Sequence, residues 1–399
     1  MRLIADGVVD RDGVAGLASQ LGYSDRHLTR LMSSELGAGP LAIARAQRAQ
    51  TARTLLETTD LRVSDVAHAA GFGSIRQFND TIREVFASSP TDLRRGASHD
   101  RQREPGRLAL RLAYRAPLPS DVLLRFLAAR VIRGVESVDE AGYHRVLRLP
   151  RGIGVVHVRT PSEADSPHLV IALDLEHLAD LPVAVQRVRA TLDLDADPEA
   201  IDSVLRKDPA LRRSLRARPG CRVPGTSDPT ELLVRAVLGQ QVSVAGARTL
   251  AARLVARLGT PVVDQGELTH AFPDAETIAD ADLSWLGMPS ARRATVRDAC
   301  SAIAGGKLVL DPGRDRDELR RELDAIRGIG PWTTEYMAMR LLHDPDAFPS
   351  TDLGVLHGAR SLGLPSDPRA LTDHAQRWQP FRAYAVQHLW NALDPGETR

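Results

Sequence analysis

Apolar residues recur at helical spacing through most of the C-terminal half of the chain. From residue 198 onward, stripes with steps of three and four residues predict a mainly helical region. Two such stripes run through Leu232, Ala236 and Leu238, and through Leu250, Leu254 and Leu258.

The pattern differs between residues 108 and 194, where short apolar runs alternate with helical stretches. Strands are expected at 108–114, 146–149, 154–159 and 169–173. Gly152 and Gly154 lie between two of these runs, which indicates a hairpin turn rather than a nucleotide loop. The predicted fold class is therefore mainly α with one α+β domain, which holds a small antiparallel sheet.

The first ninety-five residues contain an internal repeat with a shift of fifty positions. Ser24 aligns with Ser74, and Arg26 with Arg76. Each unit begins with a short apolar helix (14–20 or 63–69), continues through a glycine turn and ends in a longer helix. This order predicts two helix-turn-helix units.

One face of each longer helix is expected to be apolar, and the other to be free for contacts. The apolar positions are 28, 32 and 36 in the first unit and 78, 82 and 86 in the second. The free side chains are of types that reach base edges and phosphates. They are Arg26, His27, Thr29, Arg30, Ser74, Arg76, Gln77, Asn79 and Arg83.

The most informative local motif is a glycine pair that follows a helical stripe. Leu319, Leu323 and Ile326 fall on one helix face, and Gly328-Ile329-Gly330-Pro331-Trp332-Thr333 follows them. Two glycines around an apolar residue allow a tight reversal, and proline suits the first turn of a second helix. The motif predicts a helix, a hairpin and a helix, in which Gly328, Ile329, Gly330 and Thr333 approach a DNA backbone phosphate. Alone, it would equally describe an ordinary connector.

The motifs that accompany this hairpin in the sequence indicate a family. After a short helical stretch comes Phe348-Pro349-Ser350-Thr351-Asp352. With stretches 218–225, 235–244 and 378–390, these motifs resemble the helix-hairpin-helix DNA glycosylases, most closely the bacterial 3-methyladenine DNA glycosylase II (AlkA type), from about residue 108 onward. The resemblance implies that Asp352 is catalytic and that Trp332, Tyr336 and Trp390 line the base pocket.

These residue types suit excision of a damaged base. An N-alkylated purine carries positive charge and a weak glycosidic bond, so a carboxylate can stabilise the oxocarbenium-like sugar. Aromatic walls favour a flipped cationic base through stacking and cation–π attraction. Each aromatic residue alone would equally suit a core. Asp344 and Asp346 are interpreted as solvated turn residues.

The residues that are absent restrict the chemistry. The chain has two lysines, Lys207 and Lys307, and in strand-cutting relatives a lysine stands where Trp332 stands. A monofunctional hydrolase without AP lyase activity is therefore expected. Cys221 and Cys300 are too few for an iron–sulfur cluster, and no zinc-ligand spacing occurs, so we expect no cofactor. The resemblance implies at most a structural monovalent cation at the hairpin.

The wedge that fills the gap left by a flipped base departs from the family pattern. The family places a leucine where this chain has Gln241. Gln241, with its neighbour Gln240, is the predicted wedge, although both residues would also suit a cap or a surface position. The effect of this change on the substrate range stays open.

Residues 5–95 resemble the AraC-type DNA-binding domain, most clearly at Gly71-Phe72, Gln77-Phe78 and Ser89-Pro90. A helical repeat protein is the alternative, but two units are few for a solenoid. The order of modules is similar to that of Ada-like adaptive-response proteins. Their methyl-accepting zinc domain needs four cysteines, so the sensor is expected on a separate protein or upstream of this start.

Composition adds little beyond the compartment and the charge. The chain has 399 residues, is 43% hydrophobic and contains no long uncharged apolar run, which indicates a globular protein in the cytoplasm, associated with the nucleoid. Its net charge is only +1, so DNA contacts must come from local patches. One such patch is the arginine-rich stretch 94–115. A solvated linker without DNA contact is equally consistent with that stretch.

The predicted organisation has four parts: a double helix-turn-helix domain (1–95), a basic linker (96–107), an α+β domain (108–194) and a helix-hairpin-helix domain (195–399). The predicted function is excision of alkylated bases from double-stranded DNA, combined with transcription activation of the alkylation response, by a monomer. The alternatives are a regulator with an inactive glycosylase body, and a glycosylase for oxidised or deaminated bases.

Overall fold

The computed structural model describes residues 4, 8–59, 61–96, 107–160, 167–262 and 266–393. The chain divides into two compact units. The first comprises residues 1–112, 147–157 and 170–188, and the second comprises 113–146, 158–169 and 189–399. The central part of the predicted basic linker, 97–106, lies outside the described residues.

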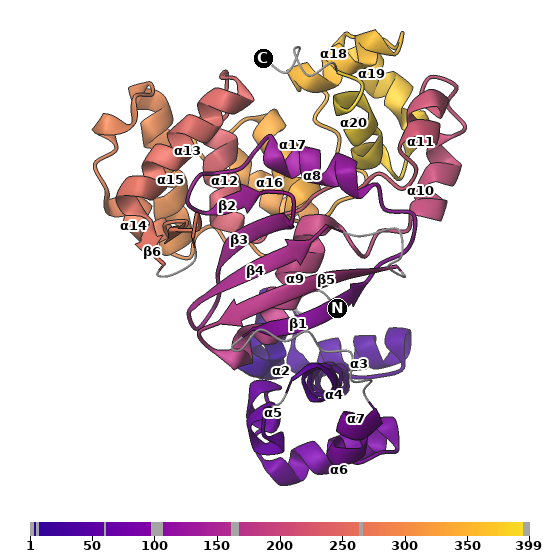
Figure 1. The fold of residues 1–399 in the computed structure, drawn as a ribbon. Coiled ribbons are helices and arrows are strands. Elements are labelled where there is room, and N and C mark those ends of the chain that lie inside the picture. The colour runs from indigo at the N-terminus through magenta and orange to yellow at the C-terminus, as the bar shows by residue number, and fades with distance from the viewer. Residues whose placement is uncertain are drawn as a thin grey trace. The chain divides into compact units, whose positions relative to one another are not determined.

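The N-terminal helices of the first unit form the two predicted helix-turn-helix pairs (Figure 1). Gly22 and Gly71 turn the chain within the pairs, with φ of 69° and 81°. This left-handed backbone suits glycine. The helices are α2 (Val8–Gln20), α3 (Asp25–Leu36), α4 (Pro40–Thr58), α5 (Val63–Ala69), α6 (Ile75–Phe86) and α7 (Pro90–Gly96).

Helix α4 joins the two pairs and packs against α2, α5, α6 and α7. Its arginines bind the second pair. Arg45 Nε donates to Thr81 Oγ1 at 2.9 Å, and Arg48 donates to the Gly71 carbonyl at 3.2 Å. The Arg53 guanidinium lies 5.3 Å from the centre of the Phe86 ring. In the first pair Leu28 and Met32 are buried as predicted, but Leu36 is 52% exposed, because it is the last residue of α3.

A five-stranded antiparallel sheet follows, in the order β1-β5-β4-β3-β2 (Figure 1). In β1 every second residue is buried, which places one face of that strand on a core. Strand β2 pairs with β3, with Glu136 opposite Arg145. The elements are β1 (Leu108–Ala113), α8 (Ser120–Ala128), β2 (Glu136–Val138), β3 (Gly142–Arg148), β4 (Ile153–Arg159), β5 (His168–Leu175), η1 (Leu178–Asp180) and α9 (Leu181–Leu192).

The rest of the second unit is almost entirely helical. Its elements are α10 (Pro198–Leu205), α11 (Arg212–Ala217), α12 (Pro229–Leu238), α13 (Val244–Leu258), β6 (Thr260–Pro261), β7 (His270–Ala271), α14 (Ala275–Asp280), η2 (Ser284–Leu286), α15 (Ser290–Ala304), α16 (Arg316–Asp324), α17 (Pro331–Arg340), α18 (Leu353–Ser361), α19 (Pro368–Ala375), η3 (Gln376–Trp378) and α20 (Arg382–Trp390).

Two hydrophobic cores organise these helices. One contains side chains of α12 to α17, and the other contains side chains of α10, α11 and α17 to α20. Helix α17 contributes to both cores, and its Tyr336 packs against both. Residues on this helix therefore face the region where the two cores meet.

The predicted fold class is confirmed. The expected turn around Gly152 is also present, where the Leu149 amide donates to the Gly152 carbonyl at 2.9 Å. The main differences are that β3 begins at Gly142 rather than at residue 146, and that the three-residue strand β2 was not predicted. No helix among the described residues is long and apolar enough to cross a membrane.

Candidate active site

Asp352 is the N-cap of α18, and both of its carboxylate oxygens hold hydrogen bonds. Oδ1 accepts from the Val355 amide at 2.8 Å and from Trp390 Nε1 at 2.8 Å. Oδ2 accepts from Trp332 Nε1 at 2.7 Å. The carboxylate is thus fixed by one backbone amide and two indoles from different helices.

Two aromatic stacks extend from these indoles. On α17, Trp332 and Tyr336 are four residues apart, and their rings stack with centroids 5.3 Å apart and planes 15° apart. At the end of α20, Trp390 stacks on Phe126 of α8, with centroids 6.2 Å apart. The structure therefore brings all four predicted residues (Asp352, Trp332, Tyr336 and Trp390) together and adds Phe126.

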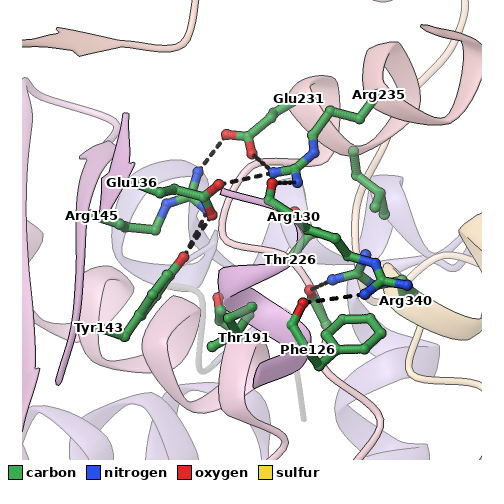
Figure 2. Close-up of a pocket in the computed structure, with 13 residues that line it drawn as sticks. Phe126, Arg130, Glu136, Tyr143, Arg145, Thr191, Thr226, Glu231, Arg235 and Arg340 are labelled. Carbon is green, nitrogen blue, oxygen red and sulfur yellow. Dashed lines mark hydrogen bonds and ion pairs between the residues drawn. The ribbon is translucent and has the colours of Figure 1, made fainter. Parts of the chain in front are cut away.

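Two arginines that the sequence did not single out complete the site. Arg130 lies over the Phe126 ring at 3.7 Å, and Arg340 lies 5.4 Å from the same ring and 5.3 Å from the Tyr336 ring. Arg340 also donates to the Tyr336 hydroxyl. Figure 2 shows both arginines beside Phe126 in a pocket of the second unit.

Burial and charge perturb the titratable groups of this pocket. Burial, together with the positive charge of Arg340, lowers the pKa of Arg130 to about 10, against the opposing effects of Tyr336 and Asp352. Burial alone would raise the pKa of the Tyr336 phenol. Arg340 and Arg130 outweigh that effect and hold the pKa below its usual value. The pocket is therefore electropositive where its arginines meet Tyr336.

A buried ion network supports the segment that carries Arg130 (Figure 2). Arg145 pairs with Glu136 at 2.8 Å and also with Glu231, and Arg235 pairs with the same two glutamates. Arg235 also donates to the Arg130 carbonyl. The two guanidiniums and two carboxylates of this network neutralise each other. The network therefore holds the Arg130 segment in place but adds no net charge to the site.

The predicted hairpin forms between α16 and α17. Gly328 has φ of 91°, and Gly330 is the N-cap of α17, with open space where a Cβ would stand. The buried Ile329 faces the core. Thr333 is only 1% exposed, so its side chain faces inward rather than toward a DNA backbone. Its hydroxyl accepts from Gln240 Nε2 at 3.2 Å.

The two glutamines predicted as a wedge have different surroundings. Gln240 Nε2 also donates to the Gly328 carbonyl at 2.9 Å, so Gln240 ties the hairpin to the turn between α12 and α13. Gln241 is exposed at that turn with φ of 56°, a conformation that is uncommon for a residue with a side chain. Gln241 is the more exposed of the two, and the wedge role stays a prediction for both.

The predicted DNA-contact residues of α3 and α6 lie mostly on exposed surface. Ser74 caps α6 by accepting from the Gln77 amide at 3.2 Å, as Ser24 caps α3. Within α3, Arg30 contacts His27 at 3.1 Å. Asn79 is half-buried. The exposed residues are Arg26, His27, Thr29, Arg30, Ser74, Arg76, Gln77 and Arg83.

One sequence interpretation is wrong. Asp344 is not a solvated turn residue, since it is 3% exposed and pairs with Arg316 at 2.7 Å and with Arg320 at 3.4 Å. Asp346 is bound by Arg382 through two contacts of 2.8 Å. Both carboxylates are thus engaged by arginines rather than by the pocket.

Several backbone carbonyls near the hairpin have hydrogen-bond partners. The carbonyls of Arg327, Gly328 and Gly330 each accept a hydrogen bond from within the chain. Among the described residues no cluster of His, Cys, Asp and Glu could hold a metal ion. A monovalent cation held by backbone carbonyls of the hairpin stays a prediction.

Comparison with known proteins connects these features to two domain families. Residues 109–228 match the AlkA N-terminal domain, and residues 17–96 match a helix-turn-helix domain. The chain is 51% identical over 398 residues to the probable bifunctional transcriptional activator/DNA repair enzyme AlkA of Mycobacterium tuberculosis, across 99% of this chain and 79% of the relative.

Two further relatives match the glycosylase part. DNA-3-methyladenine glycosylase 2 of Escherichia coli is 33% identical over 282 residues, across 70% of this chain and 95% of the relative. The structure of a 3-methyladenine DNA-glycosylase from Archaeoglobus fulgidus superposes with a TM-score of 0.63 at 21% identity, across 70% of this chain and 97% of that one. The latter likeness concerns the fold alone.

Proposed function

The chain belongs to the family of bifunctional transcriptional activator/DNA repair enzymes AlkA, and on that premise we propose that it has two activities on double-stranded DNA. One is hydrolysis of the N-glycosidic bond of alkylated bases such as 3-methyladenine. The other is sequence-specific promoter binding that activates the alkylation response. The observation that carries the first activity is the fixed carboxylate of Asp352 between two aromatic stacks.

The geometry supports a mechanism that begins with base flipping. A base turned out of the duplex would stack against the Trp332–Tyr336 and Trp390–Phe126 walls, and Gln241 would fill the gap that it leaves. Flipping costs a few kcal/mol, and the cost is lowest for a damaged pair, which contributes selectivity.

Asp352 then acts at the sugar. As the bond between C1′ and the base nitrogen breaks, its electron pair leaves with the base and the sugar becomes oxocarbenium-like. A negative carboxylate stabilises that charge. The indole donors keep the carboxylate in one orientation, so no reorganisation is needed during bond cleavage.

The helix-hairpin-helix element would hold the DNA backbone. The N-terminus of α17, with Gly330 at its cap, presents unpaired backbone amides, which favour a phosphate without reading sequence. The absence of a side chain at Gly330 leaves room for close approach of the backbone.

We further propose that excision is monofunctional. A lyase needs an amine that forms a Schiff base with the sugar, and the position beside Asp352 holds Trp332. The two lysines of the chain, Lys207 and Lys307, lie on exposed surface elsewhere. The product would be an intact strand with an abasic site. We also propose that one monomer acts on each lesion, and that methyl sensing is supplied by a separate protein.

The decisive experiment is release of bases from methylated duplex DNA, measured by chromatography. Wild-type protein should release 3-methyladenine, and Asp352→Asn should lower the rate by a factor on the order of 10² or more. Asp352→Asn should still bind DNA that contains the lesion, because asparagine caps a helix as well as aspartate does. Asp367→Asn is the matched control, since Asp367 caps α19 in the same way. Equal release by wild type and Asp352→Asn would refute the assignment.

A further inference from the structure

We infer that Arg130 and Arg340 form a leaving-group site that stabilises negative charge on the departing base and so favours uncharged lesion bases over cationic ones. The inference rests on the proposed function, because it assumes that the flipped base lies between the aromatic stacks beside Asp352. It concerns the pocket lined by Phe126, Arg130 and Arg340, at the other end of these stacks.

One wall of the pocket links Asp352 to these arginines through two rings. The Trp390 indole donates to Asp352 Oδ1 at 2.8 Å and stacks on Phe126. Arg130 lies beside both rings: its guanidinium is 3.7 Å from the centre of the Phe126 ring and 6.0 Å from that of Trp390.

The second wall makes the same connection from α17. The Trp332 indole donates to Asp352 Oδ2 at 2.7 Å and stacks on Tyr336. Arg340 donates to the Tyr336 hydroxyl and lies 5.3 Å from the centre of its ring. Each of the two aromatic stacks therefore has the Asp352 carboxylate at one end and a guanidinium at the other.

Neither guanidinium is neutralised by a carboxylate among the described residues. Arg130 donates to the Phe126 carbonyl at 3.2 Å, and Arg340 donates to the carbonyls of Pro224 and Gly225 at 2.7 and 2.9 Å. By contrast, the nearby Arg145 and Arg235 are matched by two glutamates. Burying an unpaired charge costs free energy. Unpaired buried charges are therefore unusual in proteins unless they have a functional role.

This charge arrangement matches the charges that develop in the reaction. Cleavage leaves positive charge on the sugar, toward Asp352, and moves an electron pair onto the base, toward the arginines. Water adds to C1′ and loses a proton. An uncharged lesion base leaves as an anion and gains that proton, whereas a cationic base leaves neutral and the proton goes to solvent, so in both cases the products are an abasic site and the neutral free base. A preorganised pair of guanidiniums lowers the energy of the anionic base before that protonation.

The effect depends on the charge of the lesion. A cationic base such as 7-methylguanine is repelled by the arginines when it binds and becomes neutral as it leaves, so relative to free protein and DNA the two effects cancel. An uncharged base such as hypoxanthine becomes anionic as it leaves, and the arginines attract it. The pair should therefore raise the second-order rate constant, counted from free protein and DNA, for uncharged bases relative to that for cationic bases.

The test compares single-turnover excision of hypoxanthine and of 7-methylguanine from matched duplexes at protein concentrations well below saturation, where the observed rate reports the second-order rate constant. Arg130→Gln removes the charge but keeps donors, and should lower the ratio of the two rates roughly tenfold. Arg130→Lys keeps the charge and should hold the ratio within about threefold of wild type. Arg257→Gln is the matched control, since Arg257 lies over Trp285 at 4.7 Å, outside the pocket.

The outcomes separate this inference from the proposed function. If wild type releases 7-methylguanine but the ratio is the same in Arg130→Gln, or if wild type releases no hypoxanthine, the inference is overturned and the proposed function stands. If wild type releases neither base nor any other alkylated base, the proposed function falls. Thermal melting reports whether each variant folds, and Arg340→Gln answers the same question if Arg130→Gln does not fold.

Discussion

Asp193 is a buried carboxyl group whose ionisation opposes folding. It follows α9 in a left-handed conformation, with φ of 51°, and accepts from the Val223 amide at 2.9 Å. Burial raises its pKa from 3.8 to about 7, against the effects of that hydrogen bond and of Arg222. The folded chain therefore keeps a proton here at pH values where the unfolded chain has lost it.

This shift predicts a pH-dependent gain for Asp193→Asn. A raised carboxyl pKa contributes stability that is complete below pH 3.8 and is lost as the pH rises to about 7. Asp193→Asn removes that loss, so its melting temperature relative to wild type should increase across this range, by the equivalent of roughly 4 kcal/mol at the plateau.

The melting temperature of Asp193→Asn has to be compared with that of the wild type at each pH, because a second group also makes the stability depend on pH. Burial, with a contribution from Arg218, lowers the pKa of His388 from 6.5 to about 4, and this makes the wild type lose stability as the pH falls through that range. Asp121→Asn is the control, because Asp121 is exposed and pairs with Arg125 at 2.9 Å. A flat difference for Asp193→Asn would show that Asp193 is ionised in the folded protein.

At the residue scale, the family resemblance predicted the cluster around Asp352 but not its positive end. Asp352, Trp332 and Tyr336 belong to one local motif, so they lie close together in the chain. Phe126 and Arg130 precede Asp352 by more than two hundred residues, and only the tertiary fold brings them to the same cluster of side chains. Arginine is also so abundant in this chain that no single guanidinium was distinctive.

At the scale of elements, the conformation of the hairpin depends more on Gly328 than on Gly330. A Cβ on Gly328 would stand 2.1 Å from Thr295 Oγ1, and the φ of 91° is strained for any other residue. Thr295 Oγ1 donates to the Arg327 carbonyl at 3.0 Å, so the clash would break a bond that shapes the hairpin. At Gly330 no atom lies within 4 Å of a Cβ.

We therefore expect Gly328→Ala to cost about 1–3 kcal/mol of stability and to weaken binding to duplex DNA. Gly330→Ala should change stability by less than about 0.5 kcal/mol, which makes it the matched control for folding. Thermal melting and a DNA-binding titration of the two variants would measure both effects. Similar melting of both variants would contradict the assigned strain at Gly328.

Helices and strands could be predicted from the sequence where the apolar pattern was long or was bounded by glycine. Helix α5 has the predicted bounds, and Leu319 and Leu323 of α16 are buried as their spacing indicated. Strand β2 was missed because three residues carry no alternation. Leu36 was misassigned because helical periodicity does not show where the packing partner ends.

At the scale of the whole molecule, the two proposed activities lie on different residues and should be separable. Gln77 is exposed on α6, and Asp352 is held by two indoles in the pocket. Gln77→Ala should weaken promoter binding by about 1–3 kcal/mol without changing excision. Asp352→Asn should slow excision without changing promoter binding. A promoter-binding titration and the base-release assay on both variants check this, and loss of both activities in either variant would contradict it.

The hydrogen bonds to Asp352 also have an optical consequence. Two of the four tryptophans of the chain touch the reacting carboxylate, whereas Trp378 is fully buried and donates to Asp208 instead. A base that enters between Trp332 and Trp390 changes the surroundings of two indoles at once, and Asp352→Asn keeps both indoles while replacing one of the two oxygens that accept from them. The protein thus contains its own fluorescent reporter, which can time the arrival of a flipped base separately from its release.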